Sequence, residues 1–104
     1  MSKRITVGLL SDTDPVHWNF IRNRWRWIDA IKKPTLSFDV GAMKPSPAIY
    51  RAAAVNVEAP PQRCLFIDDL EANVDGARAV GMQAIRFETV NLLTGQLDAL
   101  GLLA

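Results

Sequence analysis

The sequence lacks the features that mark several large classes of protein. Its 104 residues contain one cysteine, which excludes an internal disulfide and any metal site built from several cysteines. Twelve basic and eleven acidic side chains leave a net charge of +1, which gives no general attraction to nucleic acid or anionic membrane. No apolar run approaches the length that spans a bilayer, and the apolar stretch near the amino terminus is too short for a secretory signal. These absences predict one cytoplasmic domain over residues 1–104, with no membrane or nucleic-acid partner.

What the sequence does contain is an alternation of strand-like and helix-like segments. Strands are predicted at four short apolar or β-branched segments, residues 4–10, 35–40, 64–67 and 82–87. Helices are predicted after the Asp14-Pro15 and Ser46-Pro47 pairs, over residues 16–23 and 47–57, and again over residues 70–77 and 95–103. Such alternation implies right-handed crossovers. The predicted fold is α/β, a small parallel sheet of about four strands flanked by helices.

Polar side chains follow three of the predicted strands. Ser11 comes after the first, Lys44 after the second, and Asp68 and Asp69 after the third. The carboxyl ends of parallel strands meet at one edge of an open sheet, where ligands bind. A lysine and a carboxylate pair at that edge suit a magnesium-bound phosphate, with the carboxylates on the metal and the ammonium on the phosphoryl oxygens.

Each of these residues also has a simpler interpretation. A serine after a strand is usually a turn residue or a helix cap, and Lys44 before proline is compatible with a solvated loop charge. The acidic pair is compatible with a cap that complements a helix dipole. Their common position at the ends of strands favours a shared site over three unrelated roles.

Three segments resemble motifs of a known family. GAMKPSPAIY and LFIDDLEANVDGARAVGMQAIRF are similar to the third and fourth motifs of the haloacid dehalogenase-like (HAD) hydrolases, and LLSDTDPVHW is similar to their second. The resemblance extends from about residue 5 to residue 102. It is greatest to the phosphatase branch that includes bacterial glucose-1-phosphate phosphatases. It implies a Rossmannoid core and magnesium-dependent hydrolysis of phosphoesters, with a small phosphorylated ligand.

The resemblance implies a role for each candidate residue. Ser11 would hydrogen-bond the transferring phosphoryl group, and Lys44 would neutralise the nucleophile and the phosphate. Asp69 would coordinate magnesium, with Asp68 beside it as a direct or water-mediated ligand. Asn73 would orient the groups around the metal.

The chain departs from the family pattern at two points. Asp12 stands where the second motif usually has asparagine, and an ionised carboxylate repels phosphate and donates no hydrogen bond. The first motif, DxDxT, which supplies the nucleophilic aspartate, occurs nowhere in these residues. The sequence therefore resembles the carboxyl-terminal part of the core domain, without its first strand and cap. We expect weak or no magnesium binding and no phosphatase activity from this chain by itself.

The family resemblance also bears on the sheet. In the family, the first strand lies between the strands of the second and fourth motifs. Without it, those two strands either pair with each other or accept a strand from elsewhere. The alternatives to a partial enzyme are a non-catalytic, self-associating module and one half of a split phosphatase completed by another chain.

The segment over residues 17–33 is rich in tryptophan and basic residues. Read as a helix it is apolar on more than one face, so a single core contact does not absorb it. One interpretation is a helix and loop that cover the sheet. Another is an interface, for which aromatic and arginine side chains are typical anchors. A third is stacking on single-stranded nucleic acid, which the low net charge disfavours. We predict a homodimer with Trp18, Trp25 or Trp27 at or near its interface.

Overall fold

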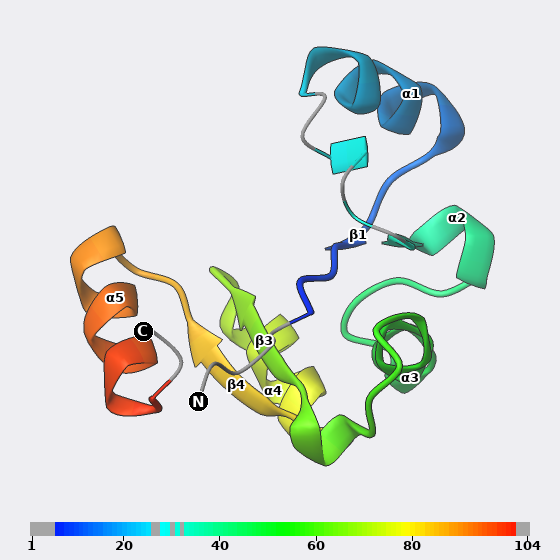
Figure 1. Ribbon diagram of the computed structural model, residues 1–104. Coiled ribbons are helices and arrows are strands. Elements are labelled where there is room, and N and C mark those ends of the chain that lie inside the picture. The colour runs from blue at the N-terminus through cyan, green and yellow to red at the C-terminus, as the bar shows by residue number, and fades with distance from the viewer. Residues whose placement is uncertain (1–5, 26–27, 30, 32, 102–104) are drawn as a thin grey trace.

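The computed structural model describes residues 6–25, 28–29, 31 and 33–101. Strands and helices alternate along the chain, as the sequence predicted (Figure 1). None of the helices in these residues is long and apolar enough to cross a membrane. The elements in order are β1 (Leu10–Ser11), α1 (Pro15–Arg24), β2 (Thr35–Leu36), α2 (Ser37–Val40), α3 (Pro47–Asn56), the 3-10 turn η2 (Pro61–Arg63), β3 (Leu65–Asp68), α4 (Glu71–Ala79), β4 (Gln83–Arg86) and α5 (Val90–Ala99).

The four strands form two separate parallel pairs. β1 lies beside β2, with Leu10 opposite Thr35, and β3 lies beside β4, with Leu65 opposite Gln83. The predicted α/β fold with about four parallel strands is confirmed, but the strands do not make one continuous sheet. The strand of the second motif, β1, is not paired with the strand of the fourth motif, β3, so the chain has not closed the sheet by joining these two.

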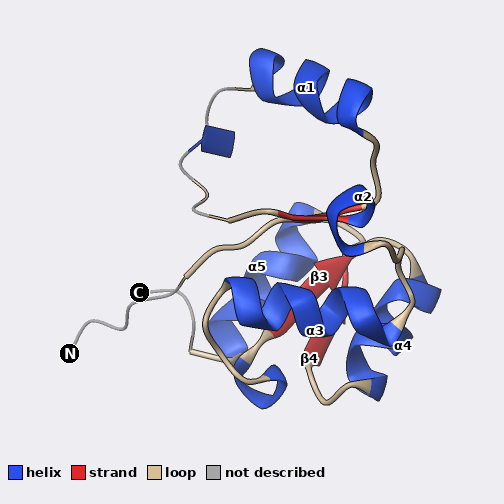
Figure 2. Ribbon diagram, turned by 90° about the vertical axis from the view of Figure 1, so that its right-hand side faces the viewer, coloured by secondary structure: helices blue, strands red, loops and turns tan. Residues whose placement is uncertain are grey.

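Helix α1 confirms the predicted start signal. The Asp14 carboxylate accepts a hydrogen bond from the backbone N–H of His17, and Pro15 occupies the first turn, where no intrahelical donor is needed. The Asp14 carboxylate also bonds to the imidazole of His17. In Figures 1 and 2 this helix stands apart from the β3–β4 pair. Local capping therefore defines where α1 begins.

The predicted strand over residues 35–40 is wrong beyond Leu36. Residues 37–40 form helix α2, because the Ser37 hydroxyl both accepts from the Thr13 amide and donates to the Thr13 carbonyl, which fixes the turn against the second-motif loop. Gly41, with φ 78°, ends this helix rather than a strand. The predicted first strand is also shorter, since β1 begins at Leu10; residues 4 and 5 lie outside the described part.

Two helix predictions also need correction. The last helix begins at Val90, five residues before the predicted start, because the Thr89 hydroxyl caps it by accepting from the amide of Leu92. Its predicted end at residue 103 lies outside the described residues. Ser46 precedes α3, but its side chain makes no capping bond, and Pro47 alone supplies the start signal.

The core lies where α3 and α4 pack on the β3–β4 pair (Figure 2). Ile49 and Tyr50 of α3 and Ala77 of α4 are fully buried there. Half-buried apolar side chains from every strand pair join them, among them Leu10, Phe66 and Ala84. This packing fixes the carboxyl end of β3, where the acidic pair begins.

Candidate functional site

Lys44 joins the carboxyl ends of the two strand pairs. Its backbone N–H donates to Asp12 Oδ1, just after β1, over 3.0 Å. Its side-chain Nζ donates to Asp68 Oδ2, at the end of β3, over 2.9 Å. Only 14% of the Lys44 side chain and 8% of the Asp68 side chain are exposed, so this ion pair is largely shielded from water. The structure thus brings two of the predicted site residues, Asp12 and Asp68, to a third, Lys44.

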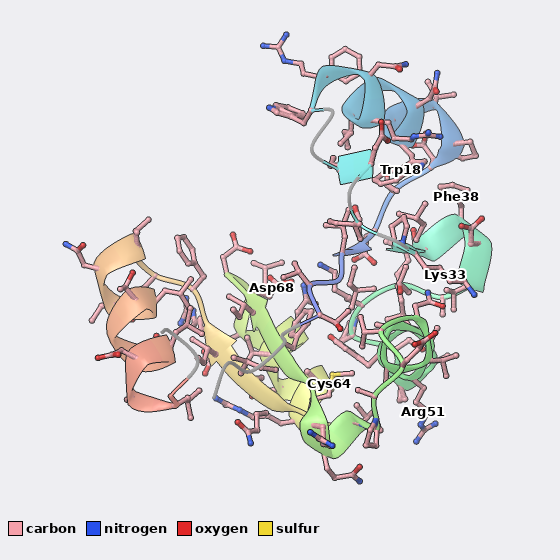
Figure 3. The ribbon with its side chains drawn as sticks, in the orientation of Figure 1. Trp18, Lys33, Phe38, Arg51, Cys64 and Asp68 are labelled. Atoms are coloured by element: carbon pink, nitrogen blue, oxygen red, sulfur yellow. The ribbon has the colours of Figure 1, made fainter. Side chains whose placement is uncertain are left out.

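Asp68 is the most strongly held carboxylate of the site. Besides Lys44, it accepts hydrogen bonds from the Leu70 amide (2.9 Å) and from the Asn73 side chain (3.3 Å). Burial by itself would raise the pKa of Asp68, but the bonds from Leu70 and Lys44 outweigh it and hold the pKa below its ordinary value. Asp68 is therefore ionised at neutral pH, and three donors fix its orientation. Figure 3 labels this residue on β3.

The other predicted site residues are placed differently. Asp69 is exposed to solvent beside Asp68, and its backbone carbonyl accepts from Arg86 Nε. Asn73 is buried and donates to Asp68, which fits an orienting role rather than a ligand. Ser11 is half-buried at the end of β1, and its side chain makes no hydrogen bond to another described residue. The Asp12 carboxylate accepts from the Lys44 amide and so holds the loop that carries Lys44.

Two aromatic residues support the site, and the sequence reasoning missed this role. The Phe66 ring lies below the Lys44 ammonium, with Nζ 5.9 Å from the ring centroid, and packs edge-on against Tyr50. Tyr50 donates to the Asn73 backbone carbonyl over 2.7 Å. Burial, with the negative charges of Asp68 and Asp12, raises the pKa of Tyr50 to about 12. The signal in the sequence was the position of Tyr50, one turn into the helix that follows the lysine motif.

Gly76 lets α4 approach the lysine loop closely. A Cβ at this position would lie 2.7 Å from the Cβ of Pro45 and 2.9 Å from the hydroxyl of Tyr50. No larger side chain fits without moving the loop or the ring. The glycine of the DDxxxNxxGA signature therefore has a packing reason in this structure.

The acidic groups fit magnesium only in part. Magnesium in proteins usually takes one or two carboxylates and fills its remaining positions with water and phosphate oxygens. Asp69 is exposed and available, while Asp68 already accepts three hydrogen bonds. Within the described residues no group of three metal-ligating side chains is found. Of the acidic pair, Asp69 is thus the exposed carboxylate, and Asp68 is the one held by other donors.

A second hollow lies away from this site. Trp18 of α1, Lys33, Asp39 of α2 and Asn56 of α3 are among the residues around a cavity of about 430 Å³ at β2. Figure 3 shows Trp18 on the side of α1 that faces α2 and Lys33. The residues that line this cavity do not include Ser11, Lys44 or the acidic pair, so the cavity is separate from the candidate site.

Comparison with known proteins decides the family. Residues 1–81 match the family described as haloacid dehalogenase-like hydrolase. This chain belongs to the HAD-like hydrolases. A flavin mononucleotide hydrolase from Arabidopsis thaliana is 30% identical over 88 residues, which is 85% of this chain and 36% of that protein. The phosphatase MT3486 of Mycobacterium tuberculosis is 44% identical over 45 residues, which is 43% of this chain and 21% of that protein.

Solved structures share the fold. An uncharacterised protein from Corynebacterium glutamicum superposes with a TM-score of 0.78 at 25% identity, over 93% of this chain and 72% of that one. The wild-type HAD family enzyme bt-2542 of Bacteroides thetaiotaomicron, in complex with magnesium and inorganic phosphate, gives 0.72 at 29% identity, over 85% of this chain and 49% of that one. The chain thus spans about a third or less of its curated relatives and half of this enzyme. The resemblance to glucose-1-phosphate phosphatases stays a prediction.

Proposed function

We propose that this chain forms the lysine- and aspartate-bearing part of a HAD phosphatase site, which holds a phosphorylated small molecule together with magnesium. The observation that carries the proposal is the bridge from Asp12 through Lys44 to Asp68. It brings the second, third and fourth motifs to one edge of the strands. This ligand chemistry is supported by two similar proteins, bt-2542 in complex with magnesium and inorganic phosphate and the phosphatase MT3486.

Each residue has a defined part in this proposal. The Lys44 ammonium faces the phosphoryl oxygens while Asp68 keeps it in place, and the Ser11 hydroxyl donates to one of those oxygens. Asp69 and Asp68 would hold magnesium, which neutralises phosphate charge when bound. Asn73 keeps Asp68 in its orientation. These groups bind and orient the phosphoryl group.

We further propose that these residues do not turn over phosphoesters by themselves. A HAD-type reaction requires a carboxylate that attacks phosphorus, and DxDxT is absent from the 104 residues. The superficially similar Asp12-Thr13-Asp14 stands in the position of the second motif. In this structure Asp12 accepts from the Lys44 amide and Asp14 caps α1.

The test measures binding and turnover separately. Titration with inorganic phosphate at high magnesium should give weak, saturable binding that Lys44→Ala and Asp69→Asn each weaken by about tenfold or more. Asp98→Asn, an exposed carboxylate on α5, is the matched control and should leave binding unchanged. Hydrolysis of p-nitrophenyl phosphate should stay at background. Phosphate binding that is unchanged in Lys44→Ala and Asp69→Asn would refute the proposed site. Turnover by the unmodified chain that is lost in both variants would refute the proposal that these residues do not hydrolyse phosphoesters by themselves.

Self-association is a second candidate, favoured by the exposed face of α1. Val16 is 79% and Phe20 64% exposed on one side of this helix, opposite the side that carries Trp18. Trp25, just after the helix, is 46% exposed. We propose a homodimer that covers this face. Trp27 lies outside the described residues.

Light scattering tests the homodimer. A dimeric mass at micromolar concentration is expected, and Phe20→Ala with Trp25→Ala should convert it to a monomer. Val55→Ala, on the exposed side of α3, is the control and should remain dimeric. A monomeric mass for the unmodified chain would refute the homodimer without affecting the phosphate site.

A further inference from the structure

The cavity beside β2 has no part in the proposed phosphate site. Its volume of about 430 Å³ lies within the range of about 300–1,000 Å³ that is usual for small-molecule sites. Such sites combine mostly apolar walls with a few polar groups that orient the ligand. The walls of this cavity come from α1, β2, α2, α3 and the segment before β2, and they contain both kinds of side chain.

The apolar part of the cavity suits an aromatic ring. Trp18 is half-buried on a helix whose other side chains are mostly exposed, and it contributes the flat face of its indole to the cavity. Leu36 of β2, Val40 of α2 and Ala52 of α3 supply aliphatic walls. A ring bound among these groups would bury apolar surface and gain the additional attraction of an aromatic pair.

Two opposite charges border the same cavity. Lys33 and Asp39 both line it, and both are exposed to solvent. Among the residues that the structure describes, neither side chain makes an ion pair or a hydrogen bond, with the other or with a third residue. Both charges are therefore available to a bound molecule.

Asn56 adds a neutral acceptor. Its Nδ2 donates to the hydroxyl of Thr35 over 2.8 Å, and Thr35 is 2% exposed. This bond fixes the amide group, whose Oδ1 makes no hydrogen bond to another described residue. A fixed amide oxygen accepts from an N–H group, and an ammonium ion offers three of these.

The pair of charges restricts the ligand to one chemical class. An anion would pair with Lys33 but face Asp39, and a cation would pair with Asp39 but face Lys33; contacts between like charges are unfavourable. We propose that this cavity binds a small zwitterion with an aromatic side group, of which a free aromatic amino acid is the simplest. The ligand carboxylate pairs with Lys33, and its ammonium pairs with Asp39 and Asn56. Its ring packs on Trp18, so the ligand connects α1 to β2, α2 and α3.

The probe for this proposal is L-phenylalanine. In an NMR titration of the full chain, the indole N–H signal of Trp18 should shift and saturate in the millimolar range or below. The signal of Trp25, which does not line the cavity, is the internal reference. A signal of Trp18 that does not move, or a shift confined to Trp25, would overturn the proposal.

Two analogues test the ligand class. 3-Phenylpropionate lacks the ammonium group and 2-phenylethylamine lacks the carboxylate. Each should bind at least about tenfold more weakly than L-phenylalanine, because each loses one ion pair and faces one like charge. Binding of either analogue with the affinity of L-phenylalanine would overturn the zwitterion as the ligand.

Crossed substitutions test the assigned contacts. Lys33→Met should weaken L-phenylalanine binding by about tenfold without weakening 2-phenylethylamine, and Asp39→Asn should weaken it equally without weakening 3-phenylpropionate. A loss of structure would weaken all three ligands, so it cannot produce this pattern. Arg51→Met on α3 and Asp98→Asn on α5 remove exposed charges outside the cavity and are the matched controls. L-Phenylalanine affinity that is the same in all four variants would overturn the proposal.

Discussion

The α3–β3–α4–β4 unit and the α1 segment differ sharply in how they are held. In the first, Ile49 and Tyr50 of α3 and Val74 and Ala77 of α4 are at most 1% exposed. In α1 no described residue is buried, and the helix is defined by its own cap at Asp14. Burial in the α3–β3–α4–β4 unit therefore contributes most to the free energy of folding. Helix α1 is held by its local cap.

This difference assigns the two regions different sensitivities. Segments with few buried contacts open at low free energy, whereas core elements open only with the whole domain. The candidate phosphate site belongs to the stable region through Asp68, Asn73 and Tyr50. The cavity at Trp18 depends on the α1 segment. Substitutions in the two regions should separate these effects.

The largest difference is expected from removing an aromatic ring in each region. Tyr50→Ala should lower the free energy of unfolding by about 3–5 kcal/mol, because it leaves a cavity and frees the Asn73 carbonyl. Phe20→Ala on α1 should change it by about 0.5 kcal/mol or less. Urea unfolding measures both. Equal losses would show that α1 is packed as firmly as α3.

The next largest effect concerns the shielded ion pair. Asp68→Ala removes the acceptor of three hydrogen bonds and leaves Lys44 unpaired, which should cost about 2–3 kcal/mol in urea unfolding. Asp69→Ala, next to it but exposed, should cost less than about 1 kcal/mol. The double variant Lys44→Met with Asp68→Ala should recover part of the loss. An equal cost at both aspartates would contradict the assignment of Asp68 as the anchored carboxylate.

A smaller effect separates two helical glycines. Gly76→Ala forces a Cβ against Pro45 and Tyr50 and should destabilise by about 1–3 kcal/mol. Gly95→Ala in α5 meets no atom within 4 Å and should stabilise by up to about 1 kcal/mol. Thermal unfolding of the two variants should shift in opposite directions. A neutral Gly76→Ala would mean that the lysine loop yields without cost.

The last effect appears only at alkaline pH. The pKa of Tyr50, raised to about 12 in the folded state, lies above its ordinary value of 10.0, so folding favours the neutral phenol. This contribution is fully present below about pH 10 and is lost as pH rises through about 12. The chain has one tyrosine, so tyrosinate absorbance follows Tyr50 alone. Titration at the ordinary pKa in the folded protein would contradict its burial, and Tyr50→Phe should abolish the alkaline loss.

Much of the fold could be predicted where local signals and packing agree. Asp14-Pro15 located α1, and the apolar segment before Asp68 located β3. The strand predicted over residues 37–40 was wrong because the Ser37 hydroxyl bonds to the backbone of Thr13. Thr13 lies 24 residues away in sequence, so no local pattern reveals this contact. The predicted start of α5 was wrong because a single threonine, Thr89, is a weak cap signal in the sequence.

The candidate site was predicted in part for the same reason. Lys44 and Asp68 were correctly predicted to be neighbours, because each follows a predicted strand. Sequence could not show which aspartate of the pair is turned inward, because that depends on donors from Leu70 and Asn73. Nor could it show that Asp12 would bond to a backbone amide, since this needs the position of a loop 32 residues away.

The two bonds of Lys44 separate position from charge. Asp12 holds the backbone of this residue, which every amino acid other than proline provides, and only the bond to Asp68 needs the ammonium. Exchange of the side chain therefore keeps the bond to Asp12 after β1 and gives up the bond to Asp68 at the end of β3. At position 44 the charge of the site and its link to β3 change together, while the backbone stays attached to the second-motif loop.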